Sequence, residues 1–206
     1  GMGVLIVTLA VMPILSSRGS VLARAESPGP TFSKAAPKMR DTARLMYAIY
    51  TVMTLIQLAL MLVSGLPLYD ALIHTLGTAG TGGFSNRNLS MGAYNNPWAE
   101  MITMAFMLLF GMNFVVYIRL LRGEGLKSFQ SDEVKAYWLL AAASMLFIAL
   151  EILPEYGNFL TALRYSSFQV SSIMSTTGYA TTDFALWPAF SHILLLLLML
   201  VGACAG

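Results

Sequence analysis

Two five-residue stretches, 95 positions apart, share a threonine in the first position, a glycine in the third and an aromatic residue in the fourth: Thr81-Gly82-Gly83-Phe84-Ser85 and Thr176-Thr177-Gly178-Tyr179-Ala180. Each stretch follows a short, partly apolar segment and precedes a long hydrophobic run. We therefore expect each stretch to be the loop of a helix, loop, helix unit, and we expect this unit to recur along the chain.

Both stretches resemble the T-V-G-Y-G filter of potassium channels, in which backbone carbonyls replace the hydration shell of a permeating cation. Carbonyls can line a pore only where the chain alternates conformations that most residues resist, and glycine adopts a positive φ at little cost. Gly83 and Gly178 stand where that freedom is needed. We expect the first-position threonines to add hydroxyl oxygens, and Phe84 and Tyr179 to pack outward and hold the diameter of the loop.

The composition indicates a protein in lipid. Of the 206 residues, 57% are hydrophobic and only 11% are charged, which is extreme for a soluble domain. A net charge of +2 without a basic patch argues against a nucleic-acid partner. The single Cys204 excludes an intrachain disulfide, and His74 and His192 alone do not make a metal-binding pattern.

Hydropathy predicts four membrane segments and part of a fifth: residues 2–15, 45–63, 101–118 and 136–153, with the fifth beginning near residue 188. Crossing the hydrocarbon core of a bilayer takes roughly 20 residues. The first and last segments are shorter than that, so we expect the chain to be an excerpt from a longer protein.

Lysine and arginine are concentrated in two of the connections between these segments. Six lie between the first and second segments: Arg18, Arg24, Lys34, Lys38, Arg40 and Arg44. Four lie between the third and fourth: Arg119, Arg122, Lys127 and Lys135. Only Arg87 and Arg164 remain for the connections that carry the two loops. The positive-inside rule therefore predicts that the loops face outward.

The outward half is predicted to be acidic and bordered by tryptophan. Five acids fall in or beside it: Asp70, Glu100, Glu151, Glu155 and Asp183. Such a face raises the local concentration of cations, although any one of these acids is as well explained as an ordinary solvated charge. We expect Trp98 and Trp187 to lie in the outer aromatic belt.

Residues 68–76 and 164–174, just before the two loops, are predicted to be pore helices. The C-terminal end of a helix carries partial negative charge, which suits a cation in the pore. Asp70 favours the N-terminal end of the first of these helices. Arg164 is unfavourable at the N-terminal end of the second, so we expect it to pair with an outward acid such as Glu155 or Glu151.

Further motifs extend the pattern: Gly1-Met2-Gly3-Val4, Arg24-Ala25-Glu26-Ser27-Pro28-Gly29-Pro30, residues 80–85, Phe168-Gln169-Val170, residues 176–183 with Trp187-Pro188, and Cys204-Ala205-Gly206. With this set, the chain resembles the TrkH-type potassium uptake proteins of bacteria over its whole length. That family belongs to a superfamily with KtrB and the fungal Trk transporters.

The resemblance implies an all-α integral membrane fold of four repeated helix, pore-loop, helix units around one potassium-channel-like pore. The chain then divides as follows: residues 1–15 end a helix of the first repeat, 16–43 form a cytoplasmic linker, 44–122 are the second repeat, 123–135 form another cytoplasmic linker, and 136–206 are the third repeat, up to its last helix.

The resemblance further implies that the ten residues of the two stretches bind K⁺, the transported ion, and that a loop within the last helix of the third repeat is the gate. The segment Gly202-Ala203-Cys204-Ala205-Gly206 resembles the beginning of that loop. The family usually shows two glycines before the gate cysteine, and Ala203 replaces one of them.

The activity implied is potassium uptake across the inner, cytoplasmic membrane by a multi-pass chain that is not an enzyme. Symport is implied too, but coupling to H⁺ or to Na⁺, as against channel-like flow, stays open. The partners implied are membrane lipid, a second copy of the full-length protein in a homodimer, and a cytoplasmic, nucleotide-binding regulatory subunit of the TrkA type. K⁺ is the only bound species that the resemblance implies.

Three other interpretations stay open or are set aside. Ser85 and Ala180 stand where potassium filters carry a glycine, which favours a looser, less selective Na⁺/K⁺ pathway. The loops could instead be glycine kinks in a non-conducting structural or assembly subunit. An intramembrane protease is disfavoured, because Tyr69-Asp70 has no G-x-G-D partner and no G-x-S-G is present.

Overall fold

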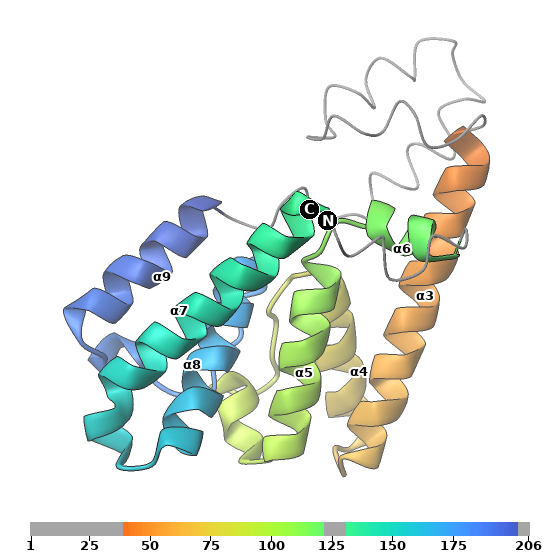
Figure 1. The fold of residues 1–206 in the computed structure, drawn as a ribbon. Helices are drawn as coiled ribbons and strands as arrows, with labels where there is room; N and C mark the ends of the chain where they lie inside the picture. Colours follow the sequence, from red (N-terminus) through yellow and green to blue (C-terminus); the bar gives the residue numbers. More distant parts are fainter. Residues whose placement is uncertain (1–38, 122–130, 202–206) are drawn as a thin grey trace.

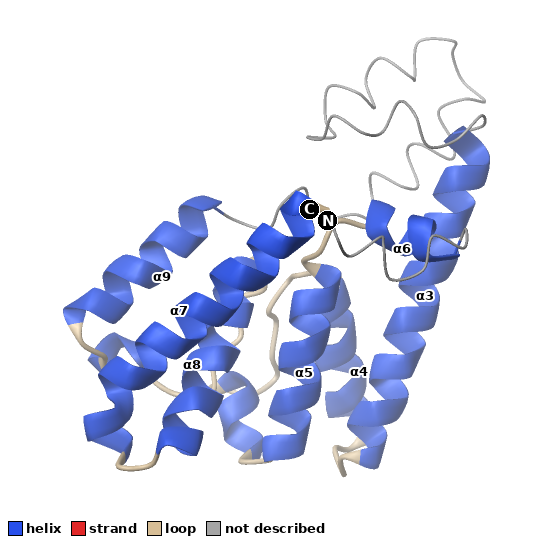
Figure 2. Cartoon of the chain, in the orientation of Figure 1, coloured by secondary structure: helices blue, strands red, loops and turns tan. Residues whose placement is uncertain are grey.

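The computed structural model describes residues 39–121 and 131–201, whose helices form two units (Figure 1). The first unit contains α3 (Met39–Val63), α4 (Leu68–Ala79), the 3-10 helix η1 (Ser90–Tyr94) and α5 (Pro97–Phe110), followed by the short α6 (Val115–Arg119). The second unit contains α7 (Asp132–Tyr156), α8 (Phe159–Met174), the 3-10 helix η4 (Phe184–Leu186) and α9 (Ala189–Val201). In the described ranges all regular structure is helical, as predicted (Figure 2).

Two helices are long and apolar enough to cross a membrane: Arg44–Val63 within α3, with 20 residues, and α7, with 25 residues. At 1.5 Å per residue, 20 residues span about 30 Å, the thickness of the hydrocarbon core. The predicted segments 45–63 and 136–153 are therefore helical, although α3 and α7 begin several residues before them.

Large apolar side chains are exposed on α3 and α9, the helices at opposite sides of the molecule in Figure 1. On α3 the exposed ones include Val52, Leu55 and Ile56, and on α9 they include Ile193, Leu196, Leu197 and Leu200. Continuous exposed apolar surface of this kind is rare on soluble monomers and is typical of contact with lipid. The surface therefore agrees with the prediction from composition.

The predicted single segment 101–118 is wrong, because α5 ends at Phe110 and α6 begins at Val115. Two tyrosine hydroxyls donate hydrogen bonds to carbonyls in the last turn of α5. The Tyr137 hydroxyl donates to the carbonyl of Leu108 at 3.1 Å, and the Tyr117 hydroxyl donates to that of Leu109 at 2.8 Å. A helix end leaves its last carbonyls without helical partners, and these hydroxyls satisfy two of them.

The short helices α4 and α8, with 12 and 16 residues, occupy the positions predicted for the pore helices. They are about 18 and 24 Å long, too short to cross the hydrocarbon core. The α8 helix begins at Phe159, before the predicted residue 164, because Asn158 caps it by accepting from Leu160 N at 3.0 Å. Each short helix leads into one of the two glycine-containing stretches.

The two units share a core. One cluster lies within the second unit and includes Ile148, Val170 and Leu195. Another joins Met61, Leu66, Ala71, Met91, Ala99 and Met107 of the first unit to Phe168 and Tyr179 of the second. Because Phe168 precedes the second loop and Tyr179 belongs to it, this loop is packed against the first unit as well as its own.

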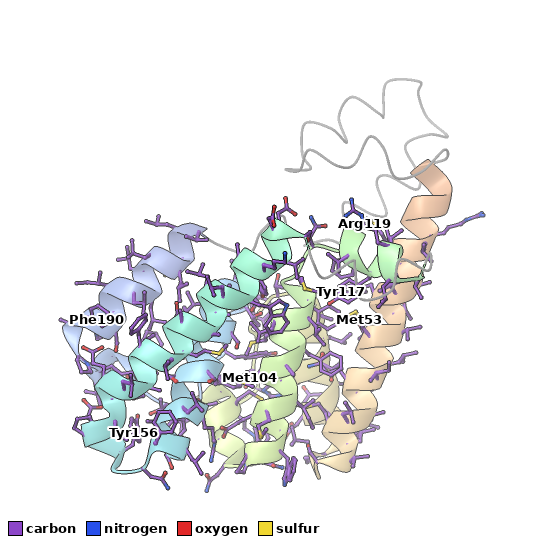
Figure 3. The ribbon with its side chains drawn as sticks, in the orientation of Figure 1. Met53, Met104, Tyr117, Arg119, Tyr156 and Phe190 are labelled. Atoms are coloured by element: carbon purple, nitrogen blue, oxygen red, sulfur yellow. The ribbon has the colours of Figure 1, made fainter. Side chains whose placement is uncertain are left out.

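The two tryptophans that were predicted to lie in the outer aromatic belt differ in burial. Trp98 at the start of α5 is 71% exposed, as an interfacial residue would be, but Trp187 is only 4% exposed. The Trp187 indole donates to the Tyr156 hydroxyl at 3.3 Å. Figure 3 places Tyr156 near one end of the molecule and Arg119 of α6 near the other.

Candidate functional site

The two stretches adopt the same backbone conformation. The first-position residues Thr81 and Thr176 have φ values of +48° and +56°, and the third-position residues Gly83 and Gly178 have φ values of +63° and +92°. The glycines therefore have the positive φ that was predicted, and the threonines share it, which was not. Such a conformation costs a threonine about 1–2 kcal/mol and concentrates at functional sites.

Both stretches are also tied to their short helices by the same bonds. The carbonyl of Gly77 accepts from Gly82 N at 2.8 Å and from Gly83 N at 3.4 Å. In the second unit the carbonyl of Ser172, 95 positions after Gly77, accepts from Thr177 N at 2.9 Å and from Gly178 N at 3.4 Å. The amides of the loops thus face their own helices.

The carbonyls of the loops are divided into two groups. In the described parts of the chain no protein donor reaches the carbonyls of the first three positions of either loop, which are Thr81, Gly82, Gly83, Thr176, Thr177 and Gly178. The carbonyls of Phe84, Tyr179 and Ala180 each accept a hydrogen bond from a protein group. Six carbonyl oxygens of the two loops are therefore without a hydrogen-bond donor among the described residues.

The two loops lie against each other. A Cβ added at Gly83 would stand 2.0 Å from the carbonyl oxygen of Thr177 and 3.3 Å from the carbonyl carbon of Gly178. Position 83 requires glycine for two reasons: its φ is positive, and a side chain would collide with the second loop. The absence of a side chain at Gly83 thus allows the two loops to come into direct contact.

The fourth-position aromatic residues, both predicted to pack outward from the pore, differ in burial. Tyr179 is fully buried, and its ring lies 5.4 Å from that of His74. Its hydroxyl oxygen lies 3.2 Å from the carbonyl oxygens of both His74 and Phe84, and it can donate to either. Phe84 is 77% exposed in the part of the chain that the structure describes. Only Tyr179 holds its loop in place here.

His74 supports the first loop from behind. Its Nδ1 donates to the carbonyl of Asp70 at 2.8 Å, so in the neutral ring Nε2 accepts from the Ser85 hydroxyl at 3.0 Å. Ser85 Oγ accepts in turn from Arg87 N at 3.1 Å. The Asp70 carboxylate accepts from Asn86 at 2.6 Å and from Arg87 at 3.4 Å. This network fixes the end of the first loop.

Arg87 lies outside the helices, two residues after the end of the first loop. Its guanidinium stands 5.8 Å from the centre of the Tyr94 ring. Its interaction with the Tyr94 hydroxyl, and then that with Asp70, raises the pKa of Arg87, while burial raises the pKa of Tyr94. Arg87 therefore stays charged beside the Asp70 carboxylate.

The 3-10 helix η1 of the first unit holds the end of the second loop. Gly92 N donates to the carbonyl of Ala180 at 3.2 Å, and Ala180 N donates to Ser90 Oγ at 3.4 Å. A Cβ at Gly92 would stand 2.4 Å from the carbonyl oxygen of Thr181. Contact at this distance requires a glycine at position 92.

Arg164 pairs with one of the acids predicted for the outward half, but not with either of the two given as examples. Arg164 pairs neither with Glu155 nor with Glu151 but with Glu100 of α5, at 2.6 Å from Nε to Oε2 and 2.7 Å from Nη2 to Oε1. The Glu151 carboxylate instead accepts from the Ser191 hydroxyl. Glu100 stands one helix away in the other unit, and hydropathy along the chain carries no information on such pairs.

Several residues of this site were missed from sequence: Gly77, Ser90, Gly92, Glu100 and Ser172. The 95-residue offset was the available signal for Gly77 and Ser172, because each precedes its fourth-position aromatic residue by seven positions. Among the described residues no group of three or more histidine, cysteine or acidic side chains could hold a metal ion. The predicted gate, residues 202–206, lies outside the described residues, as do residues 1–15 and most of both linkers.

Comparison with known proteins agrees with this geometry. The family model TrkH, described as a cation transport protein, matches residues 1–152. The chain is 33% identical over 210 residues to the Trk system potassium uptake protein TrkH of Salmonella typhimurium and 30% identical over 213 residues to TrkG of Escherichia coli K12. All of this chain is covered, but only 44% and 43% of those relatives, so it spans less than half of their length.

The fold is similar to the crystal structure of the potassium transporter TrkH from Vibrio parahaemolyticus, with a TM-score of 0.79 and 27% identity. That match covers 99% of this chain and 42% of the other. The relatives are named as transport proteins, in agreement with the prediction that the chain is not an enzyme. The predicted family is therefore confirmed, and this chain belongs to the TrkH family of cation transport proteins.

Proposed function

We propose that the chain forms part of a potassium uptake pathway and that its two loops supply part of the selectivity filter. The observation that carries this proposal is the repeated left-handed conformation at the first and third positions, combined with six carbonyls that no described protein donor occupies. Carbonyl rings of this kind replace the hydration shell of K⁺. The names of the relatives, which are potassium uptake proteins, point to the same ion.

Within this proposal, the ten residues at 81–85 and 176–180 make up the filter segments, and K⁺ is the transported substrate. The loops face outward from the inner membrane, and residues 202–206 begin the gate below them. Both bases of the outward half pair with acids, Arg87 with Asp70 and Arg164 with Glu100. The remaining outward acids, Glu155 among them, keep that face attractive to cations.

The larger assembly is also part of the proposal. The complete protein forms a homodimer in lipid and binds a TrkA-type, nucleotide-binding subunit on the cytoplasmic side. The filter is only modestly selective, because Ser85 and Ala180 replace the fifth-position glycine. Uptake is coupled as symport.

The test is growth at limiting K⁺ in a bacterial strain without its own potassium uptake systems, supplied with the protein that contains this chain. Gly83→Ala and Gly178→Ala are compared with Gly157→Ala and Gly65→Ala. The controls are matched in backbone strain, since φ is +63° and +92° at the filter glycines and +65° and +94° at the controls. Neither control has an atom within 4 Å of an added Cβ.

We expect the parent and both controls to support growth, and both filter variants to lose it. Equal growth of all four variants would support the non-conducting alternative, in which the loops are packing kinks. Competition by Na⁺ in the same assay separates a potassium filter from the less selective Na⁺/K⁺ pathway, because strict exclusion of Na⁺ would contradict a loose filter.

A further inference from the structure

The fourth carbonyl of each loop is bound by a buried hydroxyl. In the second loop the Ser172 hydroxyl donates to the carbonyl of Tyr179 at 2.6 Å. In the first loop the Tyr179 hydroxyl approaches the carbonyl of Phe84 to 3.2 Å. Ser172 and Tyr179 are both fully buried. A hydroxyl thus reaches the fourth carbonyl of both loops, but from different sources, and the Tyr179 hydroxyl lies equally close to the carbonyl of His74.

The source differs because the two short helices differ at one residue. Ser172 lies seven positions before Tyr179, and Gly77 lies seven positions before Phe84. Gly77 has no hydroxyl to offer. A Cβ at position 77 would stand 2.1 Å from the Tyr179 hydroxyl oxygen and 3.4 Å from the carbonyl oxygen of Phe84. The Tyr179 hydroxyl therefore occupies the space where a serine at position 77 would reach the same carbonyl.

These bonds also set the direction of the two carbonyls. Ser172 belongs to α8, behind the second loop, so the Tyr179 carbonyl is turned toward that helix. The Phe84 carbonyl is turned toward Gly77 and the Tyr179 hydroxyl, on the α4 side of the first loop. In both loops the carbonyls of the first three positions accept from no described protein donor, whereas the fourth does.

We propose that a hydroxyl holds the fourth carbonyl of each loop away from the ion path, so that each loop offers K⁺ only its first three carbonyls. Gly77 has no hydroxyl, so Tyr179 of the second loop supplies the donor for the first loop. The conformation of the first loop therefore depends on that of the second. This inference rests on the proposed filter function. It narrows the K⁺ ligands in this chain to residues 81–83 and 176–178.

The test is a double substitution that moves the hydroxyl back to the helix of the first loop. Tyr179→Phe removes the donor, and Gly77→Ser supplies one from α4, as Ser172 does from α8. In the parent, Gly77→Ser places a Cβ 2.1 Å from the Tyr179 hydroxyl oxygen, which leaves no room for both. In the Tyr179→Phe background the nearest ring carbon is 3.2 Å away, which a small shift relieves.

The first measurement is the melting temperature of the purified full-length variants, which does not depend on transport. We expect Gly77→Ser to lower it in the parent and to raise it in the Tyr179→Phe background. If Gly77→Ser changes the melting temperature in the same direction in both backgrounds, a serine at position 77 does not replace the Tyr179 hydroxyl as donor, and the inference is overturned. The second measurement is the ratio of K⁺ to Na⁺ uptake.

We expect Tyr179→Phe to lower that ratio roughly tenfold, because the released carbonyl can move toward the smaller ion, and the double variant to recover most of it. A tenfold change corresponds to about 1.4 kcal/mol, within the range of one hydrogen bond. An unchanged ratio in Tyr179→Phe would overturn the inference while leaving the filter proposal standing. Failure of the parent to take up K⁺ would instead overturn the proposed function, and with it the assignment of ligands.

Discussion

Arg164 and Glu100 belong to different helical units and form a two-point ion pair, with Nε 2.6 Å from Oε2 and Nη2 2.7 Å from Oε1. The Glu100 side chain is only 3% exposed and that of Arg164 is 25% exposed. Bidentate arginine pairs fix geometry as well as charge. This pair therefore holds α8, which leads into the second loop, against α5 of the first unit.

Replacing Glu100→Gln leaves Arg164 charged and without its carboxylate. Breaking a buried ion pair by removing one partner costs about 3 kcal/mol or more. We expect a clear fall in the melting temperature of the purified protein.

The matched control is Glu155→Gln, at the exposed acid that the charge pattern favoured as the partner. An exposed substitution away from such features changes stability by less than about 0.5 kcal/mol. Equal effects of the two substitutions would mean that the pair contributes nothing to the docking of the two units.

Removal of the Ser85 hydroxyl is predicted to loosen the first loop. In Ser85→Ala the ring nitrogen Nε2 of the fully buried His74 loses its partner at 3.0 Å. A buried polar group without a partner costs about 1–3 kcal/mol. Thermal unfolding should show this loss, whereas Thr51→Ala, which removes an exposed hydroxyl from α3, should leave the melting temperature nearly unchanged. No loss in Ser85→Ala would exclude Ser85 as a support of the loop.

Gly92→Ala is predicted to disturb the second loop from the first unit. Its Cβ would stand 2.4 Å from the carbonyl oxygen of Thr181, so η1 must move and both backbone bonds of Ala180 are lost. We expect reduced growth at limiting K⁺ together with lower stability. Gly157→Ala is the control, since nothing lies within 4 Å of its Cβ. Normal growth of Gly92→Ala would show that the second loop does not depend on this contact.

Tyr117→Phe is predicted to weaken the end of α5. The phenol hydroxyl donates to the carbonyl of Leu109 at 2.8 Å, and its loss should cost about 1 kcal/mol. Tyr47→Phe on the exposed face of α3 provides the comparison for loss of a hydroxyl alone. If both substitutions shift the melting temperature equally, the hydroxyl of Tyr117 does not support the helix end.

Local sequence was enough to predict the membrane class, the two long helices, the two short ones and the positive φ of Gly83 and Gly178. These features depend on the length of apolar runs and on the conformational freedom of single residues, and both can be read within a few positions of the chain. Family membership could be recognised for a similar reason, because the motifs are short and contiguous.

Contacts between elements were settled only by the tertiary structure. Arg164 binds Glu100 rather than a nearer acid, α5 ends where two phenols reach its carbonyls, and Tyr179 is buried while Phe84 is exposed. Each of these outcomes depends on which helix docks beside which, and at what depth. Hydropathy and residue spacing do not contain information on how helices dock. The need for a glycine at position 77 could therefore be recognised only from the structure, in which the Tyr179 hydroxyl fills the space beside it.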